Sequence, residues 1–132
     1  MHPLFTHRLE VRFRDCDPLG HVNNAVYLTY LEQARFALWR TLWGFPEASR
    51  PGVIMARSEV DYKIPARYGD QLEIRLFLAR IGRTSFTYSY EVVDDAGRIV
   101  AAATTVQVMY DYKTEKPVPI SDEIRAKLEQ QV

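Results

Sequence analysis

The sequence predicts an α+β fold in which one antiparallel sheet curls around one long helix. Apolar residues recur every three or four positions over residues 24–43, whereas most of the remaining chain alternates apolar and polar residues, as half-buried strands do. The predicted order is one strand, the helix and then four strands, so the apolar stripe of the helix needs the sheet to cover it. A length of 132 residues fits a single domain, residues 1–132.

The first predicted strand covers residues 5–14 and leads into a loop. One side of this strand carries the apolar positions and one histidine, which are Phe5, His7, Leu9, Val11 and Phe13. Residues 15–23, with the sequence DCDPLGHVN, are rich in Asp, Pro, Gly and Asn and predict a loop. The loop therefore joins the strand to the long helix.

The predicted helix has a continuous apolar stripe formed by Tyr27, Leu31, Ala34, Leu38 and Leu42. Asn23 is a candidate N-cap, Gly44 a candidate C-terminal stop, and Pro46 prevents continuation. Glu32 and Arg35 have a helical spacing of three, which favours an exposed ion pair.

The later strands are predicted from alternation over residues 59–64, 71–78, 85–92 and 98–112. Breaks rich in glycine separate them at residues 68–70, 81–83 and 94–97, and the last break is typical of a hairpin turn. Ser121 or Asp122 can cap a short final helix that ends near Gln130.

Composition excludes several classes of protein. Seventeen basic and seventeen acidic side chains cancel, so the chain lacks the basic excess of a dedicated nucleic-acid binder, although a few arginines would suffice for a small phosphate-bearing ligand. The single cysteine, Cys16, cannot form an internal disulfide. The N-terminus lacks the pattern of a secretory signal, and no apolar run approaches the roughly 20 residues of a membrane span. We therefore expect a cytoplasmic protein.

Reactive side chains concentrate in residues 15–27, and three interpretations of this segment compete from the residues alone. Cys16 could be a nucleophile, but its neighbours Asp15 and Asp17 disfavour the thiolate. Asp15, Asp17 and His21 could bind a metal, but they lack a recognised metal-site spacing. The loop could also be purely structural, with Asn23 acting only as a cap and Asp15 as a turn or salt-bridge residue.

The pattern D-x-D-P-x-G-H-V-N-N-x-x-Y from Asp15 to Tyr27 resembles the signature of the 4-hydroxybenzoyl-CoA thioesterase family. The similarity continues in residues 27–35, 62–70, 82–86 and 117–120. The His-Val-Asn-Asn subgroup includes long-chain acyl-CoA and plant acyl-ACP thioesterases, whereas enzymes for aromatic substrates usually lack these four residues. The resemblance implies a hotdog fold, which is a helix wrapped in a five-stranded antiparallel sheet. It also implies a homodimer or homotetramer with active sites at subunit interfaces.

Thioester hydrolysis needs a nucleophile or base and a group that stabilises the oxyanion, and helix N-termini offer unpaired N–H donors for the latter. The resemblance implies that Asp17 is the nucleophile or general base and that the backbone N–H of Asn24 faces the thioester oxygen. His21 and Asn23 would shape the loop or assist polarisation. Tyr27 would support the loop, or would simply pack in the core.

The family's coenzyme A contacts correspond to Arg83, Thr84 and Ser85. Arg83 could pair with phosphate, and the two hydroxyls could hydrogen-bond with the nucleotide or pantetheine. The alternative is a hairpin turn with a solvated arginine. The alternating aromatic residues that follow could line an acyl pocket or form only sheet core, and they are Phe86, Tyr88 and Tyr90.

The predicted function is hydrolysis of acyl-CoA to a free acid and coenzyme A, without a metal or redox cofactor. An acyl carrier protein could replace coenzyme A as the carrier. A non-catalytic hotdog module that binds an acyl chain or a protein partner is a further alternative. Hydration or dehydration of acyl thioesters is also possible on this fold, although the loop lacks the Asp/His arrangement associated with hydratases.

Overall fold

The computed structural model describes residues 2–43 and 52–130. Its elements follow the predicted order, with a short 3-10 helix added after the first strand. They are β1 (Phe5–Glu10), η1 (Phe13–Asp15), α1 (Val26–Trp43), β2 (Val53–Tyr62), β3 (Gln71–Ile81), β4 (Ser85–Asp94), β5 (Ile99–Asp111), β6 (Lys116–Pro117) and α2 (Asp122–Glu129).

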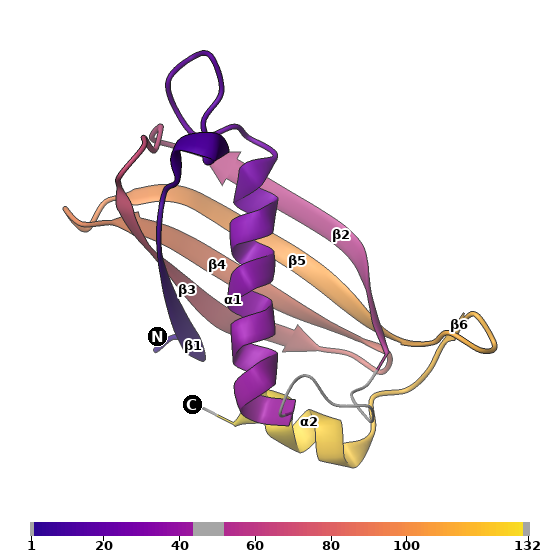
Figure 1. Cartoon of the computed structure of the whole chain (residues 1–132). Helices are drawn as coiled ribbons and strands as arrows, with labels where there is room; N and C mark the ends of the chain where they lie inside the picture. Colours follow the sequence, from indigo (N-terminus) through magenta and orange to yellow (C-terminus); the bar gives the residue numbers. More distant parts are fainter. Residues whose placement is uncertain (1, 44–51, 131–132) are drawn as a thin grey trace.

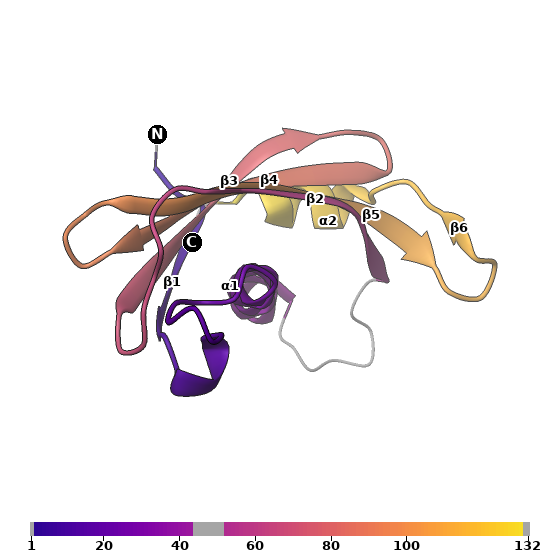
Figure 2. The ribbon, with the colours of Figure 1, turned by 90° about the horizontal axis from the view of Figure 1, so that it is seen from above.

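The strands form one antiparallel sheet with the order β1-β3-β4-β5-β2, so β1 and β2 are the two edges. The sheet curves around α1, which lies against its concave face (Figures 1 and 2). This arrangement is the predicted hotdog fold. The sheet also has a sixth strand that was not expected from the sequence, β6, whose two residues pair with the end of β5.

The apolar stripe of α1 faces the sheet, and its described side chains Tyr27, Leu31, Ala34 and Leu38 are buried. The helix begins at Val26, two residues later than predicted, and the predicted cap residue Asn23 accepts N–H groups at its start. The side-chain oxygen of Asn23 accepts the N–H of Ala25 at 2.9 Å, and its carbonyl accepts the N–H of Val26 at 2.9 Å. The predicted stop signals Gly44 and Pro46, and the side chain of Leu42, lie outside the described residues.

The predicted surface pair of Glu32 and Arg35 is wrong. Arg35 is only 7% exposed and points at the sheet, where its Nη1 donates to the hydroxyl of Tyr90 at 3.3 Å. Tyr90 also hydrogen-bonds with Thr105 at 2.6 Å, and Thr105 with Gln107. A spacing of three along a helix does not determine which side of the helix faces the sheet.

The aromatic residues of β4 belong to the core. Phe86, Tyr88 and Tyr90 are all buried between α1 and the sheet. The indole N–H of Trp39 on α1 donates to the Tyr88 hydroxyl at 2.9 Å, so this buried polar atom is satisfied. The structure therefore supports the sheet-core interpretation of these aromatics.

Strand β1 ends at Glu10, four residues before its predicted end, because Arg12 and Asp15 bend the chain into η1. The backbone N–H of Arg12 donates to Asp15 Oδ2 at 3.0 Å, and the two side chains form a salt bridge of 2.9 Å. Phe13, predicted on the buried side, is instead 78% exposed and lies edge-on to Tyr68 at 5.8 Å. The alternation of apolar and polar residues therefore predicted the buried side chains correctly only as far as Val11.

Two predicted local features are confirmed. The turn between β4 and β5 has Gly97 at φ +81°, with its N–H bonded to the carbonyl of Asp94 at 3.0 Å. Ser121 caps α2, since its hydroxyl accepts the N–H of Ile124 at 3.2 Å. Among the described helices, none is long and apolar enough to cross a bilayer.

Candidate active site

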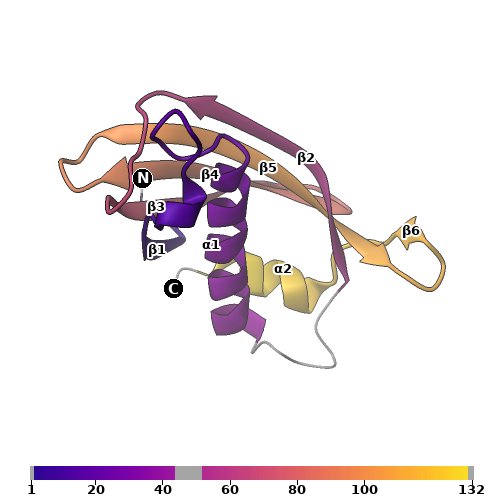
Figure 3. The same ribbon diagram turned by 45° about the horizontal axis from the view of Figure 1, so that its top comes forward.

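Three segments meet beside the N-terminus of α1: the loop after η1, the first turn of α1 and the end of β2 (Figure 3). They enclose a pocket of about 380 Å³. Its lining combines polar groups from the loop with apolar and basic groups from the other segments, and consists of Asp17, Leu19, His21, Val22, Asn24, Tyr27, Tyr62, Lys63, Ile64 and Pro65. All the loop and helix residues predicted to act in catalysis line this one pocket.

The loop turns back on itself between Cys16 and Val22, which pair as a short antiparallel bridge. Asp17 and His21 are joined by a backbone hydrogen bond of 3.1 Å, and the N–H of Gly20 donates to the carbonyl of Asp17 at 2.9 Å. Gly20 has φ +88°, a conformation that glycine adopts without steric cost. The tight turn thus brings Asp17 back toward the start of α1, as predicted.

The carboxylate of Asp17 is half-buried and held by two donors. Oδ1 accepts the N–H of Leu19 at 2.9 Å, and Oδ2 accepts the side-chain amide of Asn23 at 3.4 Å. Within the described part of the chain, Asp17 forms no salt bridge. Its carboxylate is therefore oriented without being neutralised by a cation, which suits either nucleophilic attack or proton transfer.

Asp15, two residues earlier, has a different environment. It is 2% exposed and accepts hydrogen bonds from Arg12 and from the hydroxyl of Tyr30, the latter at 2.7 Å. Burial raises the pKa of Asp15, but the hydrogen bonds from Arg12 and Tyr30 outweigh it and hold the pKa below its usual value. Asp15 is thus the salt-bridge residue that the sequence favoured.

The metal hypothesis for Asp15, Asp17 and His21 is not supported by this geometry. The oxygens of Asp15 are already occupied by Arg12 and Tyr30. Among the residues that the structure describes, no three His, Cys, Asp or Glu side chains form a group that could hold a metal ion. The residues present therefore do not fit a metal centre at this loop.

The backbone N–H of Asn24 is unpaired within the described residues, whereas the groups around it are bonded. The carbonyl of Asn24 accepts the hydroxyl of Tyr62 at 2.8 Å. Asn24 lines the pocket, and its N–H lies at the positive end of the α1 dipole. An unpaired donor in this position suits a developing oxyanion.

Tyr27 forms a buried wall of the pocket. Its ring lies edge-on to Tyr30 at 5.9 Å and to Tyr62 at 5.2 Å. Burial raises the pKa of Tyr27, which makes its hydroxyl a weaker acid. These contacts favour packing over proton donation for Tyr27. His21 is half-buried and lines the same pocket.

Sequence reasoning assigned no role to Tyr62 and Lys63, which both line the pocket. Tyr62 alternates with the charged residues Asp61 and Lys63, yet it is 49% exposed, as most residues of the edge strand β2 are exposed. In the sequence, Tyr62 and Lys63 are indicated only by their position at the start of residues 62–70, one of the segments that resemble the thioesterase family.

The predicted coenzyme A residues Arg83, Thr84 and Ser85 lie at the other end of the sheet. The loop adjoins the start of β3, where Gln71 pairs with Glu10, whereas Arg83 follows the end of β3 at Ile81. The eleven residues of β3 are separated by ten steps of about 3.3 Å, which span about 33 Å. The structure of one chain therefore does not bring these residues to the pocket.

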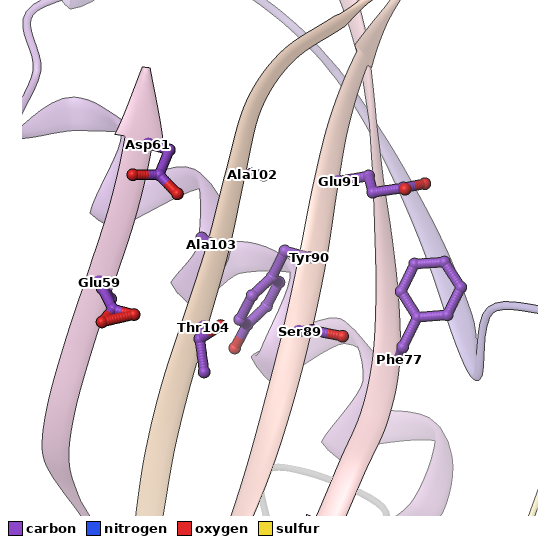
Figure 4. Close-up of a pocket in the computed structure, with 9 residues that line it drawn as sticks. All are labelled: Glu59, Asp61, Phe77, Ser89, Tyr90, Glu91, Ala102, Ala103 and Thr104. Carbon is purple, nitrogen blue, oxygen red and sulfur yellow. The ribbon is translucent and has the colours of Figure 1, made fainter. Parts of the chain in front are cut away.

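A larger hollow, of about 490 Å³, lies on the face of the sheet opposite to α1 (Figure 4). Three of its lining side chains are carboxylates: Glu59 and Asp61 lie on one side of the hollow, and Glu91 lies on the other side with Phe77. Arg57 pairs with Glu59 at 2.7 Å. The carboxylates would repel the phosphates of a nucleotide, so the smaller pocket beside α1 is the better candidate for such a ligand.

Comparison with known proteins agrees with this geometry. Residues 11–128 match the family described as the Thioesterase-like superfamily. The long-chain acyl-CoA thioesterase FadM of Escherichia coli (strain K12) is 31% identical over 128 residues, which is 95% of this chain and 97% of FadM. The acyl-CoA thioester hydrolase YbgC of Escherichia coli O157:H7 is 27% identical over 130 residues, 96% of this chain and 97% of YbgC.

Solved structures share the fold over nearly the whole chain. A predicted thioesterase from Bacillus stearothermophilus has a TM-score of 0.89 and 30% identity, covering 97% of this chain and 96% of that protein. A thioesterase from Thermus thermophilus, complexed with coenzyme A and Zn, has a TM-score of 0.83 and 34% identity, covering 96% and 92%. These relatives confirm the prediction of a thioester hydrolase. The chain belongs to the thioesterase-like superfamily.

Proposed function

We propose that this enzyme hydrolyses an acyl-CoA thioester to a free carboxylic acid and coenzyme A, with Asp17 as nucleophile or general base. The observation that carries the proposal is that Asp17 and Asn24 line one pocket, and that the N–H of Asn24 is unpaired among the described residues. The first group can start the reaction and the second can stabilise the charge that it creates. The names of FadM and YbgC support the acyl-CoA substrate class.

Two routes are compatible with this pocket. In the first, a carboxylate oxygen of Asp17 attacks the thioester carbon, the C–S bond breaks, and water then hydrolyses the mixed anhydride. In the second, Asp17 removes a proton from water, and the resulting hydroxide attacks the same carbon. Both routes place negative charge on the thioester oxygen, facing the Asn24 N–H, and both release the CoA thiolate, which takes up a proton. Asn23 would orient Asp17, and His21 would shape the loop or polarise the carbonyl.

The proposed chemistry uses only side chains and backbone groups of the protein. Thioester hydrolysis changes the oxidation state of no atom, so it calls for no redox cofactor. Asp17 and His21 line the pocket, while the second carboxylate of the loop, that of Asp15, is held by Arg12 and Tyr30. We therefore assign no step to a metal.

The remote position of Arg83, Thr84 and Ser85 supports a site shared between two copies of the chain. Within the described residues, the outer edge of β2 has no strand partner. Antiparallel pairing of two such edges would place the Val53 end of one copy beside the Tyr62 end of the other. Arg83 to Ser85 lie near the Val53 end, since Val53 pairs with Met109, whose N–H bonds the Thr84 carbonyl at 2.9 Å.

We accordingly propose a homodimer in which Arg83, Thr84 and Ser85 of one copy bind the coenzyme A portion at the pocket of the other. A homotetramer would be two such dimers. An acyl carrier protein presents the same pantetheine arm and is the alternative carrier. We also propose that the chain is a cytoplasmic member of the His-Val-Asn-Asn subgroup with a single domain over residues 1–132.

The test is to assay Asp17→Asn on short, long and aromatic acyl-CoAs and on matched acyl carrier protein substrates. The substitution keeps the size of the side chain but removes its charge, and we expect kcat to fall by about 10²–10⁴-fold. Asp95→Asn, in the exposed turn after β4, is the matched control and should keep wild-type activity. A wild-type rate for Asp17→Asn would contradict its role, and tight binding of acyl-CoA without turnover by the wild type would favour the binding module.

A further inference from the structure

Tyr62, the last residue of β2, contacts the helix start through its hydroxyl. The hydroxyl donates to the carbonyl of Asn24 at 2.8 Å, although the two residues are 38 positions apart in the sequence. The ring of Tyr62 rests edge-on against buried Tyr27, at a centroid distance of 5.2 Å. The neighbouring strand and the first turn of α1 are therefore joined at the pocket.

This hydrogen bond completes the support of a single peptide group. The peptide between Asn24 and Ala25 has its carbonyl bonded to Tyr62 and its N–H bonded to the side-chain oxygen of Asn23 at 2.9 Å. With both ends of this peptide held, the backbone rotation of Asn24 is restricted. The preceding N–H, that of Asn24 itself, then keeps a defined direction while remaining unpaired among the described residues.

We propose that Tyr62 is a positioning residue that aims the Asn24 N–H at the thioester oxygen. The inference rests on the proposed function, in which this N–H stabilises the oxyanion. Oxyanion donors are effective because their direction is fixed before the reaction begins. Tyr62 acts through Asn24, so its hydroxyl affects the transition state more than the binding of substrate.

A purely structural role for the same hydrogen bond makes a different prediction. The bond would then contribute to folding only, and its loss would lower the unfolding temperature without changing kcat. The chain provides a matched comparison in Tyr112, which is 62% exposed and whose hydroxyl donates to the carbonyl of Val53 at 2.8 Å. Val53 is at the opposite end of β2 from Tyr62, so Tyr112 is remote from the Asn24 N–H of its own chain.

The experiment compares Tyr62→Phe with Tyr112→Phe, because each substitution removes one hydroxyl and leaves its ring. We expect Tyr62→Phe to lower kcat by about ten-fold while KM changes by less than about two-fold, the pattern of an interaction made in the transition state. Amide hydrogen exchange at Ala25 should become faster, since its peptide has lost one of two supports. Tyr112→Phe should leave kcat and this exchange rate unchanged, because its hydroxyl does not contact Asn24.

The inference is overturned if Tyr62→Phe keeps the wild-type kcat, if it changes only KM, or if Tyr112→Phe lowers kcat equally. Asp17→Asn is assayed in parallel to separate the two proposals. Loss of activity in Asp17→Asn together with a wild-type rate in Tyr62→Phe would reject the role of Tyr62 alone. A wild-type protein that hydrolyses no thioester would reject the proposed function, and with it this role.

Discussion

The side-chain amide of Asn23 donates to Asp17 Oδ2 across 3.4 Å, while the side-chain oxygen of the same residue accepts the N–H of Ala25 at 2.9 Å. One side chain therefore orients the pocket carboxylate and caps the long helix. The two roles use different atoms, so substitutions can separate them.

Asn23→Asp should keep the stability of the protein but lose most of its activity. Aspartate caps helices about as well as asparagine, so the free energy of unfolding should change by less than about 0.5 kcal/mol. Its carboxylate cannot donate to Asp17 and repels it, and we expect kcat to fall by about 10-fold or more. Asn23→Ala removes both roles and should also destabilise the protein by about 1 kcal/mol. Urea unfolding and steady-state kinetics measure the two effects, and equal activity of Asn23→Asp and wild type would contradict the orienting role.

Asp15→Asn should destabilise the protein in a pH-dependent way. The folded-state pKa of Asp15 lies below its unfolded value of about 3.9, so its contribution is complete above that value and is lost as the pH falls through the folded pKa. At pH 7 we expect a loss of about 1–3 kcal/mol, because Arg12 and buried Tyr30 lose a charged acceptor.

The check for Asp15→Asn is urea unfolding of variant and wild type at pH 7 and at pH 3. The difference between the two proteins should shrink at pH 3. Asp95→Asn, which is exposed, serves as control and should show little effect at either pH. A difference that grows toward low pH would contradict the assigned direction of the pKa.

Mixing two inactive or weakened variants tests whether the site is shared. If Arg83 acts at the pocket of the other copy, a heterodimer of Asp17→Asn and Arg83→Ala chains contains one pocket with both changes and one with neither. After the two variants are mixed and refolded together, we expect one of the two pockets in each heterodimer to be active with the wild-type KM. No recovery of low-KM activity would indicate that Arg83 and Asp17 act in the same chain, whereas a wild-type KM for Arg83→Ala alone would show that Arg83 does not bind the substrate.

Replacing Arg35 by methionine should leave the stability of the protein nearly unchanged. The Arg35 guanidinium is buried, its Nε lacks a hydrogen-bond partner among the described residues, and the hydroxyl of Tyr90 retains its bond to Thr105 without it. Removal of a desolvated charge in favour of an apolar side chain of similar length is often neutral or stabilising. We expect a change within about 1 kcal/mol in urea unfolding, with Arg40→Met on the exposed side of α1 as control. A loss of more than about 3 kcal/mol would show that the charge has a partner in the folded protein.

The architecture was predictable from sequence because periodicity reports directly on burial. The stripe of Tyr27 and its neighbours identified α1, and alternation identified five strands in the correct order. The errors have local causes. Hydrogen bonds between Arg12 and Asp15 ended β1 early, which a hydrophobic pattern does not encode. Arg35 lies four residues after Leu31 and three before Leu38, so the apolar stripe already directs it toward the sheet, and only its charge suggested exposure.

The pocket was only partly predictable. The motif in residues 15–27 identified Asp17, His21 and Asn24 because they are near one another in sequence, and the turn at Gly20 keeps them near in space. Tyr62 reaches Asn24 only through the pairing of strands in the folded sheet, so no local pattern identifies it. The distance of Arg83 from the pocket likewise follows from the length of β3.

The unpaired outer edge of β2 has a consequence for how the rate could respond to assembly. Tyr62 closes this strand, and a strand that gains a neighbour loses freedom along its whole length, its last residue included. Dimer formation would thus stiffen the tyrosine that holds the helix start. An engineered monomer, with every pocket residue intact, should be a slow enzyme, and diluting the native protein should depress its specific activity.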